Sequence, residues 1–203
     1  MTFLAAPAVV EAVREFLEDG SYGSGSTATT LNGELVTTRS ALSIVDGDGT
    51  DGTPVILPGI KEIHPWISPG PHANSFPHLA IEWRGHDGEN DPHSGRGFTH
   101  SLRLYTYVPV AVVAPTAARD EAQAVAYAVA LYDLTLLTLF LRDSSTGIEQ
   151  GKGLNSGGTG TAKDKIRRAV VTGSDVAVAG DSGTPALVLI TDLSVTISEP
   201  YRA

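Results

Sequence analysis

The sequence contains no cysteine and a single methionine, and only 4 of its 14 basic residues are lysines. The lack of cysteine excludes disulfide bonds and thiolate chemistry, and it leaves the redox compartment undetermined. Basic residues are also fewer than the 23 acidic ones, which gives a net charge of −9. A surface that reads a nucleic-acid sequence needs clustered Lys and Arg, so this balance argues against that class of protein. It suits a surface past which DNA slides without binding.

Long hydrophobic runs are missing as well. No stretch reaches the roughly 18 uninterrupted apolar residues that a membrane span requires. Residues 1–7 lack the basic segment that opens a secretory signal, so we expect a protein made and assembled in a cytoplasm. The chain has 203 residues, 41% of them hydrophobic, which is enough for one good core, and we predict a single domain over residues 1–203.

The clearest pattern is a strand followed by a long helix. Residues 99–108 alternate between apolar and polar or tyrosine positions, which is the period of a half-buried strand. From residue 117 to about 141, apolar side chains recur at spacings of three and four, which predicts one helix. The strand's inward side chains are Leu102, Leu104, Thr106 and Val108, and the helical ones are Ala122, Val125, Val129, Tyr132, Leu136 and Leu139 or Phe140.

The second half of this helix, residues 131–141, is apolar on nearly every side. A helix of this kind is normally buried on two sides. One interpretation is a central core helix. The other is that its outer side, including Leu137, lies in a subunit interface while Leu136 faces the core.

The other predicted elements are shorter. A helix is expected over residues 8–17, with Gly20 as its stop. Alternation predicts a strand over residues 77–84 that pairs with residues 99–108 as an antiparallel hairpin, with a polar tip at residues 85–97. Further strands are expected at residues 35–38, 41–45, 55–57, 166–172, 175–178 and 186–198, with a long loop over residues 58–77.

These elements predict an α+β fold, with the long helix and the short N-terminal helix packed on one face of a mainly antiparallel or mixed sheet. Two segments stand apart from it. Residues 21–76 are expected to form an irregular excursion of short strands and loops, and residues 144–165 a flexible loop rich in Gly, Ser and Thr.

Three local patterns resemble ligand sites, and each also fits plain structure. Asp46, Asp48 and Asp51 open like a calcium loop, but the twelfth position is Leu57 rather than Glu, so a hairpin turn is the preferred interpretation and ion binding stays open. The Gly-rich residues 151–163 resemble a phosphate loop but follow a helix instead of a strand, which favours a linker. Six histidines fall close together without typical zinc spacing and are interpreted as polar loop residues: His64, His72, His78, His86, His93 and His100. We therefore predict no catalytic, cofactor-binding or metal-binding residues.

The layout of these elements resembles the tail-terminator family of long-tailed bacteriophages and related viruses. The resemblance lies in the N-terminal helix, the strand at residues 77–83, the strand at residues 99–108, the long helix that begins among residues 119–122, and the closing strand that ends at residues 195–199.

This resemblance implies a structural, non-enzymatic virion protein of the tail or neck. Such a subunit forms a homohexameric ring at the head-proximal end of the tail tube, stops tube growth and joins head to tail. Its partners would be copies of itself, the tail-tube protein and the head-completion or connector proteins, and genomic DNA would pass through the lumen without specific binding. No cofactor is implied. Residues 21–76 and 144–165 are longer than a compact family member needs, so another neck or connector protein remains an alternative.

Two other classes of function are also consistent with the sequence. A calcium- or carbohydrate-binding module would use Trp66, Trp83 and the loop at residues 46–51. A small hydrolase would use His and Asp residues between positions 63 and 100.

We predict that deleting most of residues 144–165 leaves the melting temperature nearly unchanged. This segment contains 6 Gly and 6 Ser or Thr, and it cannot bury enough apolar surface to offset the entropy of ordering. Differential scanning calorimetry of the deletion variant tests this, and a drop of the size caused by losing a core element would refute it.

Overall fold

The computed structural model describes residues 6–19, 30–35, 59–65, 77–91, 95–109, 121–141, 166–179 and 186–199. In these residues the chain forms two long helices, five strands and a short helical turn at residues 31–35. The helices are α1 (Ala6–Asp19) and α4 (Glu121–Leu141), and the strands are β1 (Glu62–His64), β2 (His78–Asp91), β3 (Gly95–Pro109), β4 (Ile166–Ala179) and β5 (Ala186–Glu199).

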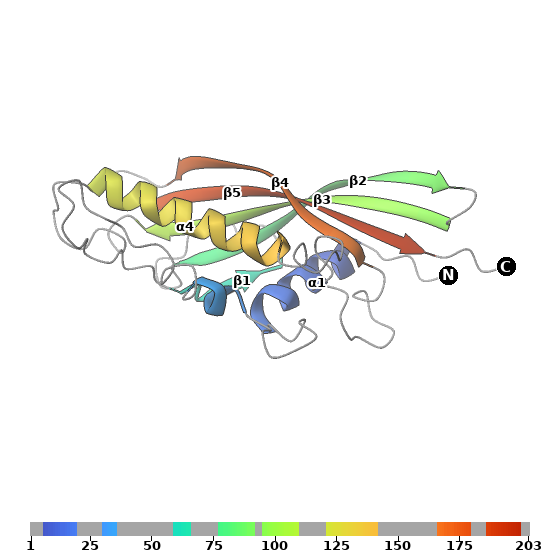
Figure 1. Ribbon diagram of the computed structural model, residues 1–203, viewed down its shortest axis with the longest axis horizontal. Helices are drawn as coiled ribbons and strands as arrows, with labels where there is room; N and C mark the ends of the chain where they lie inside the picture. The colour runs from blue at the N-terminus through green and yellow to red at the C-terminus, as the bar shows by residue number, and fades with distance from the viewer. Residues whose placement is uncertain are drawn as a thin grey trace.

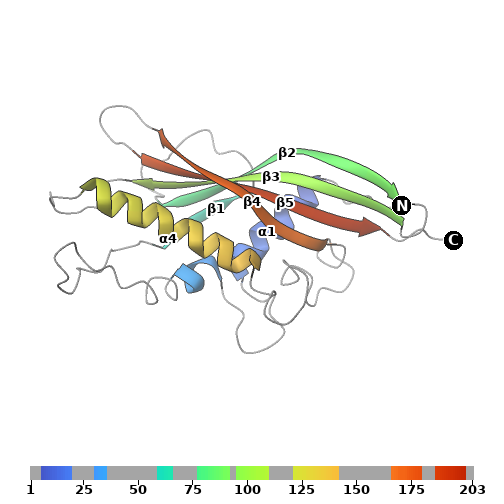
Figure 2. The ribbon, with the colours of Figure 1, turned by 45° about the horizontal axis from the view of Figure 1, so that its top comes forward.

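The five strands form one sheet in the order β1-β2-β3-β5-β4. β1 runs parallel to β2, and the other neighbouring pairs are antiparallel, so the sheet is mixed. In both Figure 1 and Figure 2, α1 and α4 lie on the same side of this sheet. The predicted α+β class with a mainly antiparallel or mixed sheet is confirmed, as is the β2–β3 hairpin.

The alternation in the sequence determines which face of the sheet is buried. Leu79 and Ile81 of β2 and Leu102 and Leu104 of β3 are at most 1% exposed, and the register places Ile81 directly opposite Leu104. Each such side chain contributes about 1.5–3 kcal/mol by leaving water. The same core includes side chains from both helices and from β5, among them Val9, Val13, Leu17, Tyr132, Leu136, Phe140, Leu189, Leu193 and Val195.

Helix α1 confirms the prediction for residues 8–17 and extends it at both ends. Val9, Val13 and Leu17 recur every four residues, so they share one side of the helix, and all three are buried. At the same surface the ring of Phe16 lies 5.5 Å from the ring of Phe140 in α4. The two helices therefore meet over the sheet.

The loop predicted over residues 58–77 is wrong at residues 62–64, where β1 pairs with the first residues of β2. Three residues are too few to display a period of two, so the sequence carries no alternation signal there. The Asn32 side chain holds the preceding segment in place. Its Oδ1 accepts a hydrogen bond from the Ile60 N–H at 2.7 Å, and its Nδ2 donates one to the Ile60 carbonyl at 2.9 Å.

The strand predicted at residues 35–38 is wrong at Leu35, which closes the helical turn at residues 31–35. Thr30 begins this turn, because its Oγ1 accepts a hydrogen bond from the Gly33 N–H at 3.0 Å, as an N-cap does. Leu31 and Leu35 point into the core. Four residues apart, they satisfy a helix as well as a strand, and the N-cap decides between the two.

The polar tip predicted at residues 85–97 is also wrong, because β2 continues to Asp91 and β3 begins at Gly95. Strand pairing extends from Gly85 opposite Ser101 to Asp91 opposite Gly95. A register shift between Trp83 and Gly85 interrupts the alternation, which is why the sequence pattern stops there. The hairpin is therefore a long arm, visible on the right of Figure 1, and β5 runs beside β3 along it, with Arg96 opposite Glu199.

The two strands predicted at residues 166–172 and 175–178 are one strand, β4. Register shifts between Ile166 and Arg168 and between Val171 and Gly173 break its alternation twice, so a single strand reads as two. The strand predicted at residues 186–198 is confirmed as β5, and the long helix is confirmed from residue 121.

Several predicted features lie outside the described residues. They are Gly20, the strands at residues 41–45 and 55–57, the first part of the long helix at residues 117–120, and the loop at residues 144–165.

We predict that Gly85→Ala lowers the free energy of unfolding by about 1–3 kcal/mol, because Gly85 has φ 138° and an L side chain is strained there. No atom lies within 4 Å of the added Cβ, so the cost comes from the backbone. Gly173→Ala is the matched control: it also has open space around the Cβ, and its φ is not in the positive range. Urea unfolding of both variants measures the difference, and equal losses would contradict this account.

Candidate interaction surface

Helix α4 is apolar on its core side and on its outer side. Tyr132, Leu136 and Phe140 are at most 1% exposed, as expected for the side that faces the sheet. The outer side, which faces solvent, is apolar as well. Leu134 is 40% exposed there and is among the large hydrophobic side chains most open to solvent in the described residues. We call the outer side the α4 stripe, and it consists of Ala130, Asp133, Leu134, Leu137 and Thr138.

The polar groups on the helix do little to make the stripe hydrophilic. The Thr138 hydroxyl donates to the Leu134 carbonyl at 2.8 Å, so much of its polarity is used inside the helix. Asp133 is half-buried, and its Oδ1 atom has no hydrogen-bond partner among the described residues. A buried carboxylate oxygen without a donor is costly, so Asp133 lowers the stability of the subunit rather than making the stripe hydrophilic. None of the helices that the structure describes is long and apolar enough to cross a membrane.

The opposite face of the sheet carries hydrogen-bonded pairs of polar side chains. Arg103 of β3 makes a two-pronged contact with Asp192 of β5 at 2.7 and 3.1 Å. This hydrogen-bonded pairing raises the pKa of Arg103 above its usual value. On the other side the Tyr105 hydroxyl donates to Glu82 at 2.6 Å, and Glu82 also pairs with Arg84 at 3.2 Å.

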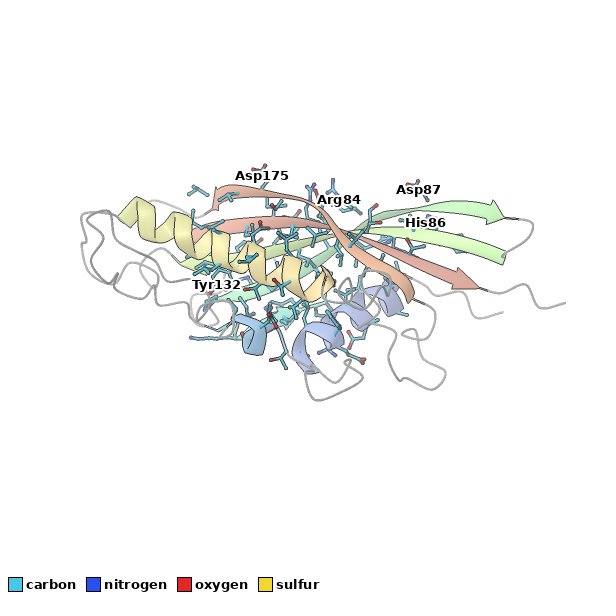
Figure 3. The ribbon with its side chains drawn as sticks, in the orientation of Figure 1. Arg84, His86, Asp87, Tyr132 and Asp175 are labelled. Carbon is cyan, nitrogen blue, oxygen red and sulfur yellow. The ribbon has the colours of Figure 1, made fainter. Side chains whose placement is uncertain are left out.

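These cross-strand pairs run across β2, β3 and β5, and each exposed pair contributes at most about 1 kcal/mol. Figure 3 shows Arg84, Asp87 and Asp175 on this side of the sheet, away from the helices. This face therefore presents neighbouring opposite charges. The main effect of these charge pairs is to fix the register of the strands.

The structure describes four of the six histidines. All four lie in strands, so the prediction that they are loop residues is wrong for these four. They meet in two pairs. The ring of His64 lies 5.5 Å from that of His78, and the ring of His86 lies 5.7 Å from that of His100. Within the described residues no group of three or more His, Asp or Glu side chains could hold a metal ion.

Around His100 the arm carries a cluster of rings. Trp83 donates its indole N–H to His100 Nδ1 at 3.3 Å, so Nδ1 is the acceptor and the neutral proton sits on Nε2. The rings of Phe98 and His86 complete the cluster at 5.9 Å from each other. Burial of His100, with a smaller contribution from the charge of His86, lowers the pKa of His100 below its usual 6.5. Trp83 therefore packs against His86 and His100 of the arm, although its ring is still 38% exposed.

A small pocket of about 230 Å³ opens between the end of α1, the turn at residues 31–35 and β1. Glu18, Asn32 and Lys61 are among its lining residues. Its volume is below the 300–1,000 Å³ of typical small-molecule sites, and Asn32 is already bonded to the backbone of Ile60. It is therefore a weak candidate for a ligand site.

The other patterns singled out in the sequence lie outside the described residues. They are the aspartates at residues 46–51, Trp66, the Gly-rich segment at residues 151–163, and the histidines at 72 and 93. The α4 stripe is the surface that both the sequence and the structure bring forward. The sequence identified the apolar second half of the helix and Leu137, which is half-buried, and it missed Leu134, the exposed leucine of the stripe.

Comparison with known proteins adds no assignment: no protein-family model matches the chain, and no curated protein matches it.

We predict that the free energy of unfolding falls as the pH drops from about 7.5 to 5.5, with a contribution from His100. Its pKa is lower in the folded than in the unfolded chain, so the unfolded chain binds more protons. The stabilisation is complete above the usual pKa of 6.5 and is lost as the pH falls through that value toward the lowered one.

The His100→Phe variant, which keeps a buried ring, should lose less stability over this pH interval than the parent protein. Replacing the exposed His86 by Gln should preserve most of the parent's pH dependence. Urea midpoints at several pH values give the comparison, and an unchanged pH dependence in His100→Phe would rule out His100 as the titrating group.

Proposed function

We propose that this protein is a structural subunit that assembles with copies of itself through the α4 stripe, and that the assembly is the ring at the head-proximal end of a viral tail tube that the resemblance to tail terminators implies. The observation that supports assembly is the two-sided apolar character of α4. Leu136 and Phe140 use one side for the core, while Leu134 and Leu137 leave an apolar surface on the other.

The energetics favour covering this surface. Burying the exposed part of a Leu side chain contributes about 25 cal/mol for each Å² removed from water. A ring requires head-to-tail contacts, so in this proposal the stripe meets a different surface on the neighbour. Contacts of this head-to-tail kind close into rings when the rotation between neighbours allows it.

Asp133 gives the stripe a polar position within the apolar surface. Its side chain is half-buried at the edge of the stripe, so a neighbour that covers the carboxylate further must supply a donor. A polar group of this kind also penalises a wrongly placed neighbour. It therefore supports a specific contact.

The rest of the proposal follows from the resemblance. A ring on a tail tube would stop tube growth and would present its other face to head-completion or connector proteins. The net charge of −9 suits a lumen through which DNA passes, because an acidic surface repels phosphates.

We expect Leu134→Glu to abolish the ring while leaving the subunit folded. The side chain is 40% exposed in the subunit, so a charge there is tolerated, but in an interface it would be buried without a partner. Leu136→Glu is the matched control. It introduces the same charge two residues away at a side chain that is 1% exposed, and it should unfold the subunit.

Circular dichroism and light scattering on both variants test this, with Leu137→Glu as a second stripe variant. If both stripe variants are folded and assemble like the parent protein, the stripe is not the interface. The tail-tube role has its own test, in which the parent protein is added to polymerised tail tubes and the tube ends are viewed by electron microscopy. Tubes that carry no added ring and continue to grow would refute that role.

A further inference from the structure

The two halves of the outer edge of β4 differ in how well they are protected against pairing with another strand. In the described part of the chain, β4 has β5 as its one neighbour in the sheet, so its other edge has no ladder partner there. Exposed edges of this kind pair readily with another strand, and proteins usually protect them with bulges, charges or proline. Only the first half of β4 carries such protection.

The first half contains both register shifts, at Ile166/Arg168 and at Val171/Gly173, together with two arginines in sequence. From Gly173 to Ala179 the pairing with β5 is regular, residue by residue. This second half has one charge, that of Asp175, and neither Lys nor Pro. It is therefore a straight edge without the usual protection.

The side chains of this half are also unusually apolar for their exposure. Val178 is 73% exposed and Val176 is 48% exposed, the two highest values among the large hydrophobic side chains in the described residues. Both lie on the same face of the strand because they are two residues apart. The Val176 N–H donates to the Asp175 Oδ1 at 2.8 Å, so this half of the strand is partly bonded to its own side chain. An edge strand with exposed valines and no neighbouring strand on its outer side is still the arrangement that recruits another strand.

We propose that this edge pairs with the same edge of a second copy of the chain, antiparallel and centred on Ala177. In that register Val176 of each copy lies opposite Val178 of the other, and Asp175 lies opposite Ala179. Two valine pairs form on one face, and the two aspartates do not face each other, as the rules for cross-strand pairs favour. A register centred on Asp175 would instead oppose two like charges. The two five-stranded sheets then join into one continuous sheet.

The contact is small and should be weak. Residues 175–179 of each copy would take part, which places the interface at the low end of the sizes seen for specific contacts. We expect a dissociation constant in the micromolar range or weaker. The contact is also two-fold, so it pairs copies, or whole rings, without competing with the head-to-tail contact of the α4 stripe.

The chain has no cysteine, so a single introduced thiol reports on one position. In the proposed register Ala177 faces itself across the two-fold axis, at a separation that a disulfide can span. Ala177→Cys should therefore form a covalent dimer under mild oxidation at a rate at least tenfold above that of Ser101→Cys. Ser101 is the matched control, because it is exposed on a strand inside the sheet. Asp175→Cys should also be slow, because position 175 faces position 179.

Sedimentation of the uncrosslinked chain supplies the second readout. The parent protein should show concentration-dependent pairing that Val176→Lys removes and that Ser101→Lys, which adds the same charge, retains. Similar crosslinking at all three cysteine positions, or pairing unaffected by Val176→Lys, would overturn the proposal. Leu134→Glu should keep the Ala177 crosslink, so a failure of edge pairing and a failure of the α4 interface give different results.

Discussion

Packing of α4 against the sheet is the contact on which the rest of the structure depends. Tyr132, Leu136 and Phe140 are buried in the core on the side where α4 contacts β4 and β5, and Phe140 also meets Phe16 of α1. Burial raises the pKa of the Tyr132 hydroxyl, as expected for a phenol removed from water. Without α4 the inward side of β5, which carries Leu189 and Leu193, would lose its cover. The same helix supplies the apolar outer side, so the core and the proposed interface are two sides of one element.

The two faces of the sheet have different requirements, and together they fix the register of the strands. Its inner face needs apolar side chains at every second position, while its other face is held by cross-strand polar pairs such as Arg103 with Asp192. A slip of one residue would exchange these two sets of side chains and would bury both charges. The irregularities at Gly85 in β2 and near Gly173 in β4 change the twist and phase of a strand while the central register is kept.

The sequence predicted the elements that are long and regular. The period of two in β3 and β5 and the period near four in α1 and α4 each extend over several repeats, so the buried face could be read directly. It failed where a pattern is short or interrupted. β1 has three residues and is held by the Asn32 side chain, a contact between residues 28 positions apart that no local pattern contains. The bulge in β2 made that strand seem shorter than it is, and the two irregularities in β4 made that strand appear as two. For the candidate surface, the sequence indicated the apolar second half of α4, but the exposure of Leu134 became visible only when the helix was placed on the sheet.

The central claim is that the apolar outer side of α4 joins copies of this chain into a ring. Native mass spectrometry of the full chain over a range of concentrations tests it most directly. The account predicts a closed assembly whose mass is an integer multiple of the 21.2 kDa subunit, with six copies for a ring of the tail-terminator type. A single species of 21.2 kDa at every concentration, up to the highest that the protein tolerates in solution, would contradict it.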